Sequence, residues 1–204
     1  MDRFTEVELR YKACLHRASA ICDLQGYLSS SHTGALDTTD MLRSAVVLCV
    51  SAYDFLLHEL FRIEVTSRYR DGRPVSRLMV PFEVAAAATS TKVESLLEAH
   101  VCQVNSYKSF VDPKKYSDAM GCFVSNPWDR VAAKLGRDAQ SVKQRVRTIY
   151  RWRNRIAHEA DINPALAGVE LWPIDKQDVV EAIHDVEKVG LASIEVLREG
   201  CNPS

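Results

Sequence analysis

The sequence contains few residues that break helices and no pattern typical of a β-strand. Only eight glycines and seven prolines occur among 204 residues, and 47% of the residues are hydrophobic. No segment shows the sustained alternation of apolar and polar residues that marks a half-buried strand. This composition excludes a collagen-like or disordered chain and favours an ordered globular protein built from helices.

Further absences narrow the function. The longest apolar run, residues 45–50, is far shorter than the roughly 20 residues that a membrane span needs. The six cysteines form no C-x-x-C pair and are interpreted as reduced packing residues. There is no secretory signal pattern, no glycine-rich phosphate loop and no paired-carboxylate motif. We therefore expect a cytoplasmic protein without a membrane span, a metal or a cofactor.

Apolar residues spaced by three and four positions predict helices along most of the chain. These are expected over residues 4–25, 38–70, 81–107, 113–120 and 127–135, and in two further segments that open at Asp138 and Asp175. Residues 26–37, rich in Ser, Gly and Thr, are expected to form a loop. Because no repeat or long linker divides the chain, residues 1–204 should form a single all-α domain, a helical bundle with additional short helices.

The most informative segment is the basic stretch between Asp138 and Glu159, which contains no acidic residue. Six positive charges lie in it: Lys143, Arg145, Arg147, Arg151, Arg153 and Arg155. The rest of the chain holds 20 basic against 27 acidic residues, a balance of about −7. This distribution predicts one localised face that attracts phosphate and argues against a general binder of polyanions.

Helix geometry divides this segment into faces, at about 100° per residue. Four polar side chains lie within roughly 60° of His158, namely Arg147, Arg151, Asn154 and Arg155. Arg153 instead lies about 140° from His158 on a straight helix. Either the helix unwinds near His158, or Arg153 turns toward a partner subunit whose copy of the helix completes the site.

The long helix expected over residues 38–70 carries an acidic residue on its apolar face. Asp54 shares the three-four spacing of Val50, Leu57 and Phe61. A carboxylate in such a position is costly unless it is paired. The hypothesis is that Asp54 accepts hydrogen bonds from Arg153 or His158 and holds them in position.

The segment Arg153-Asn154-Arg155-Ile156-Ala157-His158 resembles the R-x4-6-H signature of the HEPN superfamily, in which a polar residue follows the arginine. It is most similar to the RiboL-PSP-HEPN-like and related defence-associated branches. The context over residues 38–200 resembles that family as well: a hydrophobic helix with an acidic residue, a basic helix ending in the signature, and a final amphipathic helix. Residues 72–126 match no such pattern.

The resemblance implies a HEPN-like helical bundle that forms a homodimer, with two signatures in one composite cleft. It further implies a metal-independent endoribonuclease of a toxin or anti-phage defence system, with RNA as substrate and room for an antitoxin or defence-system partner. His158 would act as general acid/base, Arg153 would stabilise charge on the phosphorane, and Asn154 would position the reacting groups. Three further arginines would hold flanking phosphates: Arg147, Arg151 and Arg155.

Other interpretations of the same residues stay open. A lone histidine at a helix end often only satisfies terminal carbonyls and the helix dipole, and a basic stripe is often a solvated face. The main alternative function is a non-catalytic HEPN-like module for dimerisation or RNA binding. The three tryptophans are expected to anchor the core or a dimer interface: Trp128, Trp152 and Trp172.

Overall fold

The computed structural model is an all-α protein, as the sequence predicts. It describes residues 2–31, 37–75, 78–82, 84, 93–166 and 170–200. Within them the helices are α1 (Thr5–Ser31), α2 (Thr39–Arg70), α4 (Val93–Asn105), α5 (Pro113–Met120), α6 (Pro127–Leu135), α7 (Ala139–His158) and α8 (Lys176–Glu199). In this part of the chain, extended segments pair at one isolated antiparallel bridge, between Ile162 and Leu171.

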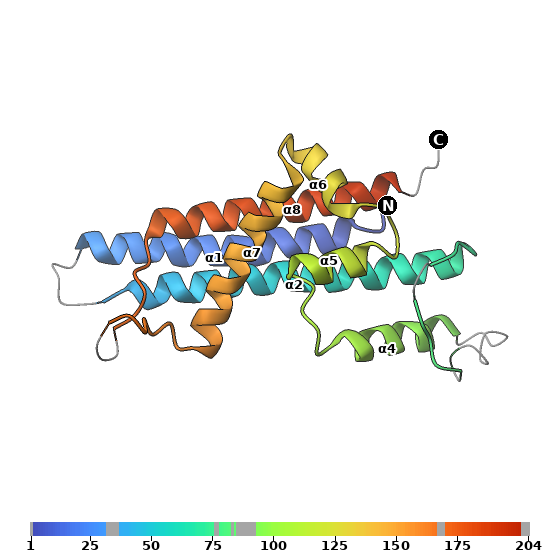
Figure 1. Cartoon of the computed structure of the whole chain (residues 1–204), viewed down its shortest axis with the longest axis horizontal. Helices are drawn as coiled ribbons and strands as arrows, with labels where there is room; N and C mark the ends of the chain where they lie inside the picture. The colour runs from blue at the N-terminus through green and yellow to red at the C-terminus, as the bar shows by residue number, and fades with distance from the viewer. Residues whose placement is uncertain are drawn as a thin grey trace.

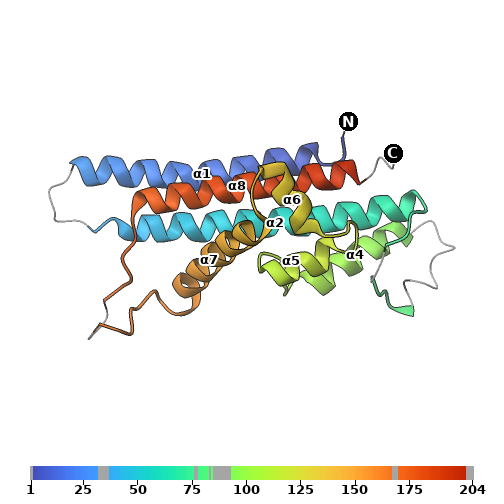
Figure 2. The same cartoon turned by 45° about the horizontal axis from the view of Figure 1, so that its top comes forward.

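Three long helices form the body of the molecule. Figures 1 and 2 show α1, α2 and α8 side by side along the longest axis, with α7 crossing them obliquely. The shorter helices cover the flanks: α6 packs on α7 and α8, and α4 packs on α2. The buried side chains of these elements form one hydrophobic cluster. The basic helix α7 is therefore held on one side by the bundle and leaves its other side to solvent.

Local sequence signals set most helix starts. Three aspartates accept backbone N–H bonds in the first turn of the following helix: Asp112, and Asp138 and Asp175, at which the sequence predicts helix starts. Asn126 precedes α6 but makes no side-chain cap bond, because its backbone is left-handed, with φ 49°. At the start of α2 it is Asp37, and not Thr38, whose side chain accepts a bond from the backbone of Thr39, at 2.8 Å.

The predicted loop over residues 26–37 is wrong in its first half, because α1 continues to Ser31. Gln25 is buried and donates to Ser29 Oγ at 2.8 Å and to Thr38 Oγ1 at 3.0 Å. These bonds link the end of α1 to the start of α2. They also give hydrogen-bond partners to polar side chains in a segment whose composition predicts a loop. The five residues after Ser31 lie outside the described residues.

The helix predicted over residues 81–107 is found in its C-terminal half, as α4. The segment is otherwise described only at 81, 82 and 84 before α4 begins, so most of its N-terminal half cannot be compared with the prediction. The stretch over residues 72–126, which matched no family pattern, contributes α4 and α5 to one side of α2.

The cysteines mostly act as apolar packing residues. Cys22 and Cys49 are buried in the core, and burial raises the pKa of both thiols. Cys102 on α4 is exposed, so the packing interpretation is wrong there. Cys201 lies outside the described residues.

Helix α2 is the most apolar of the long helices. By length and composition it could cross a membrane, although no single apolar run in it is long. In the structure 56% of its most apolar stretch is buried inside the protein. The central helix of a folded bundle passes the same test, so this feature is explained by the packing of α1, α7 and α8 around α2.

Two helical glycines offer a matched test of the packing between α1 and α8. A Cβ at Gly190 would lie 2.5 Å from Tyr11 Cε1, and Tyr11 is held in place by its hydroxyl bond to the carbonyl oxygen of Val186 at 2.7 Å. Gly190→Ala should therefore destabilise the protein by about 1–3 kcal/mol through overpacking. A Cβ at Gly26 would meet only the flexible end of Lys176.

Gly26→Ala should instead stabilise the protein by up to about 1 kcal/mol, the usual gain in a helix interior. Urea unfolding of both variants measures the difference directly. Equal stability changes for the two substitutions would contradict this account of α1–α8 packing.

Candidate functional site

The signature residues lie on a continuous helix. α7 runs without a break to His158, its last residue, and opens with an Asp138 cap. Val142, Val146 and Ile149 are buried and hold the helix against the bundle. The alternative in which α7 unwinds before His158 is therefore wrong. The faces of the helix remain as the geometry of a straight α-helix predicts.

Arg153 lies on the buried side of α7, within roughly 40° of Val146 and Ile149. Its side chain is partly buried, and its Nη1 donates to Asn154 Oδ1 at 3.0 Å. Its Nε is buried and has no hydrogen-bond partner among the described residues. His158 is exposed at the helix end. Arg153 and His158 form no mutual hydrogen bond in the described structure, so one protomer does not assemble them into a single site.

A ridge of basic side chains runs along the solvent side of α7. Lys143, Arg147 and Arg151 follow one another at intervals of four residues and are exposed or half-buried. None of the three forms an ion pair with a carboxylate in the described part of the chain. Arg145, on another face, is instead paired with Asp185 at 2.6 Å. Lys143, Arg147 and Arg151, the α7 ridge, are thus available to an external anion.

Arg155 does not belong to this ridge, contrary to the predicted role in holding phosphate. Its Nε donates to Asp161 Oδ1 at 2.6 Å, and its guanidinium lies 4.8 Å from the ring centroid of Trp172. An arginine that is paired with a buried carboxylate and stacked on an aromatic ring is committed to the fold. The prediction is corrected accordingly: Arg155 anchors the segment that follows α7.

The centre of this anchor is Asp161, which is 1% exposed. Its second oxygen accepts a bond from Arg43 Nε at 2.8 Å, and Arg43 Nη2 donates to the carbonyl oxygen of Trp172 at 2.8 Å. Ala160 and Asp161 have left-handed backbones, with φ of 50° and 55°. Such conformations are unfavourable for these residues and persist only where surrounding bonds impose them. The Arg43–Asp161–Arg155 network therefore fixes the chain directly after His158.

Sequence reasoning missed this network. Arg43 could have been noticed, because it lies among buried residues at the start of α2, where a charged side chain requires a partner. Its partner Asp161 lies 118 residues further along the chain, and nothing in the local pattern identifies it. Asp161 is the second acidic residue after the basic segment, but its place in the sequence does not indicate that it is buried or paired.

Asp54 has partners other than those predicted. Its Oδ1 accepts a bond from the backbone N–H of Phe110 at 2.8 Å and lies 3.7 Å from His58 Nε2. The ring of His58 stacks on Phe110, with centroids 4.5 Å apart, and its Nε2 lies 2.8 Å from the carbonyl oxygen of Lys108. Asp54 thus fastens the α4–α5 connection to α2. Because its side chain is also 27% exposed, it does not need Arg153 or His158 as a partner, and the hypothesis of that pairing is wrong.

Two of the three tryptophans, Trp128 and Trp152, pack in or against the core as expected, whereas Trp172 contacts Arg155 instead. Trp128 is buried, and its Nε1 donates to the carbonyl oxygen of Pro113 at 2.9 Å. Trp152 packs against the core from α7, and Trp172 lies beneath Arg155. Trp152, on α7 itself, and Trp172, through Arg155, therefore both connect the C-terminal half of α7 to the rest of the protein.

The described residues contain no cluster of three or more His, Cys, Asp or Glu side chains that could hold a metal ion. The chain matches no family model, no curated protein and no solved structure. The site itself offers four features: a basic ridge, an arginine whose Nε has no partner among the described residues, an amide beside it and an exposed histidine.

Proposed function

We propose that the protein is a metal-independent endoribonuclease of a toxin or anti-phage defence system, acting on cytoplasmic RNA as a homodimer. The observation that carries the proposal is that the charged and titratable side chains of the signature, at the end of α7, are not neutralised by described carboxylates. Arg153 and His158 form no ion pair with any described carboxylate, and Asn154 holds the guanidinium by one bond. The resemblance of this signature to the HEPN superfamily supports the same activity.

The chemistry needs only groups that these residues carry. As general base, the imidazole of His158 takes the proton of the ribose 2′-hydroxyl. The 2′-oxygen bonds to the adjacent phosphorus, and the bond from phosphorus to the 5′-oxygen breaks. The guanidinium of Arg153 stabilises the added negative charge of the phosphorane, and a protonated imidazole supplies a proton to the leaving oxygen. The products carry a 2′,3′-cyclic phosphate and a 5′-hydroxyl.

A second copy of the chain is part of the proposal because one protomer leaves Arg153 and His158 on faces about 140° apart. Exposed apolar side chains lie in the segment just after α7, at Ile162, Leu166 and Leu171. Apolar surface beside a charged site is typical of a protein interface. We propose that two copies meet there and bring Arg153 of one protomer next to His158 of the other.

The first experiment incubates the purified protein with RNA in EDTA and identifies the ends of the fragments. The proposal predicts cleavage and 2′,3′-cyclic phosphate ends. Intact RNA across a range of pH and salt would favour the second candidate, a non-catalytic dimerisation or RNA-binding module. That candidate draws its support from the separation of Arg153 and His158 within a protomer.

The α7 ridge makes a prediction about affinity. Replacing Arg147 and Arg151 by alanine should weaken RNA binding and reduce the slope of log K against log salt by about 1.4, because each phosphate contact to a single strand contributes about 0.7. Binding is measured between low and moderate salt in a His158→Ala background, which leaves the RNA uncut.

The matched control removes two arginines that are already neutralised, Arg10 and Arg70, which pair with Glu6 and Glu94. It changes the net charge by the same amount but should leave the salt slope unchanged. An equal decrease of the slope in both double variants would show that RNA binding depends on the net charge of the protein and not on the α7 ridge.

A further inference from the structure

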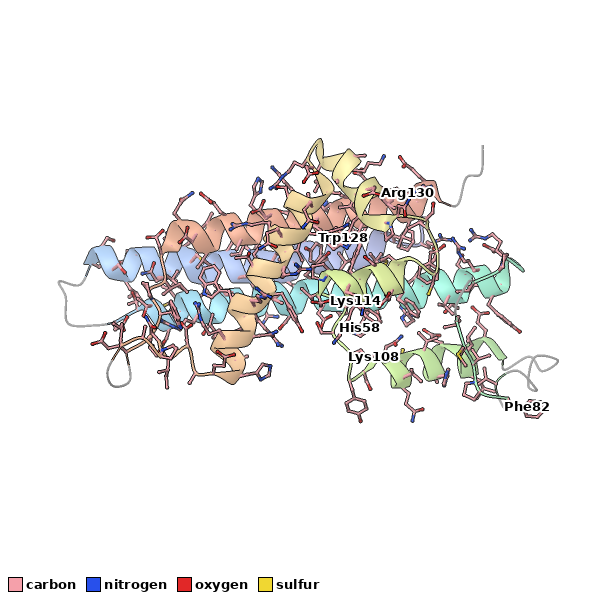
Figure 3. All side chains as sticks on the ribbon, in the orientation of Figure 1. His58, Phe82, Lys108, Lys114, Trp128 and Arg130 are labelled. Carbon is pink, nitrogen blue, oxygen red and sulfur yellow. The ribbon has the colours of Figure 1, made fainter. Side chains whose placement is uncertain are left out.

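A cavity of about 590 Å³ lies away from α7, between α2, α4, α5 and residues 78–79. Figure 3 shows this side of the molecule: Lys108 lies at the connection from α4 to α5, and Phe82 lies at the far end of α4. The volume is within the range of about 300–1,000 Å³ that is usual for sites of small organic ligands. Neither the signature residues nor the α7 ridge line this cavity.

The inner wall of the cavity is apolar. Phe61, Val101, Phe110 and Ala119 line it and are each less than 10% exposed, so they already belong to the hydrophobic core. Val104 on α4 also lines the cavity but is 44% exposed, which places it nearer the solvent. An apolar chain lying against this wall would be removed from water without displacing a core side chain.

The cavity also carries positive charge on its exposed lining. Lys108 and Lys115 are exposed, and neither forms an ion pair with a carboxylate in the described part of the chain. Within the described ranges, Lys108 Nζ donates to Asn105 Oδ1 at 3.5 Å. Asp118 is the one acidic residue among the described lining side chains, so the two ammonium groups outnumber it there.

From this combination we infer that the cavity binds an amphipathic monoanion, an unbranched alkyl chain with a carboxylate head. The alkyl chain lies against Phe61, Val101 and Phe110, and the carboxylate lies between Lys108 and Lys115. Binding of this ligand class is independent of the proposed ribonuclease activity, since the cavity shares no residue with the end of α7.

The test measures binding of octanoate, decanoate and dodecanoate to the intact protein by calorimetry, below the concentrations at which they form micelles. Each buried methylene should strengthen binding about fourfold, so each two-carbon step should give roughly a fifteenfold gain. Dodecylammonium should bind more weakly than dodecanoate. Absence of saturable binding, or tighter binding of dodecylammonium, would overturn the inference.

Matched variants locate the ligand. Val104→Glu introduces a carboxylate into the cavity and should weaken dodecanoate binding at least tenfold. Leu96→Glu is its control, because Leu96 lies on the same helix, is 45% exposed and does not line the cavity. Similarly, Lys115→Ala should weaken binding about threefold, in the range of an exposed ion pair, whereas Lys114→Ala should leave it unchanged. All four side chains are exposed, and equal effects within either pair would place the ligand elsewhere and contradict the inference.

Discussion

Replacing His158 by alanine should slow RNA cleavage by about 10²–10⁴-fold, the usual contribution of a general acid or base. The side chain is exposed at the end of α7 and forms no hydrogen bond or ion pair in the described structure. Its removal should therefore leave folding and dimerisation unchanged. Cleavage rates, the unfolding midpoint and the mass of the assembly in solution are measured on the same preparation, and growth arrest on expression should be lost in parallel.

His184→Ala provides the control for this substitution. His184 is also exposed on a helix, on α8, but lies outside the proposed site. It should retain the rate of the unmodified protein. A His158→Ala protein that cleaves RNA as fast as His184→Ala would contradict the role of the imidazole, and it would do so without any question of misfolding.

Replacing Asp161 by alanine should have the largest effect on stability, about 3–5 kcal/mol. Two guanidinium groups depend on this carboxylate, and Arg43 is only 8% exposed at its side chain. Without Asp161 the buried guanidinium of Arg43 would keep only the 3.5 Å carboxylate contact to the exposed Asp40. The left-handed backbone at residues 160–161 would also lose the two side-chain bonds that help to hold it. Arg155, at 28% exposure, can regain water, which places the loss toward the lower end of the range.

Urea unfolding measures this loss, with Asp185→Ala as the matched control. Asp185 also bridges two arginines, Arg137 and Arg145, but it is 21% exposed and its partners are more exposed still. Such a surface pair contributes at most about 1 kcal/mol. Similar losses for the two variants would show that the buried network adds nothing beyond an ordinary surface ion pair.

The parts of the fold that the sequence predicts correctly depend on neighbours along the chain. The starts of α5, α7 and α8 follow from aspartates that accept N–H bonds two or three residues later. The buried stripe of α8 follows from three-four spacing. The predicted end of α1 is wrong because it depends on a distant partner. The side chain of Gln25 donates a hydrogen bond to Thr38, which lies at the start of α2 and not in the same turn of the chain.

The candidate site shows the same limit. The position of the signature on α7 follows from spacing alone, because a helix fixes the angles between its own residues. The partners of Asp54 and Arg155 could not be predicted from the sequence, because they come from distant parts of the chain. Phe110, which binds Asp54, lies 56 residues from it. Asp161, which pairs with Arg155, is also held by Arg43 from α2. A charge pattern shows that a partner is needed but does not identify it.

The most direct test of the central claim combines two inactive chains. Arg153→Ala and His158→Ala proteins are co-expressed with different tags, and the heterodimer is isolated through both. If Arg153 of one protomer works with His158 of the other, the heterodimer retains one intact pair and should cleave RNA well above either mutant homodimer. A heterodimer that assembles but remains as inactive as the two homodimers would contradict a site shared between protomers.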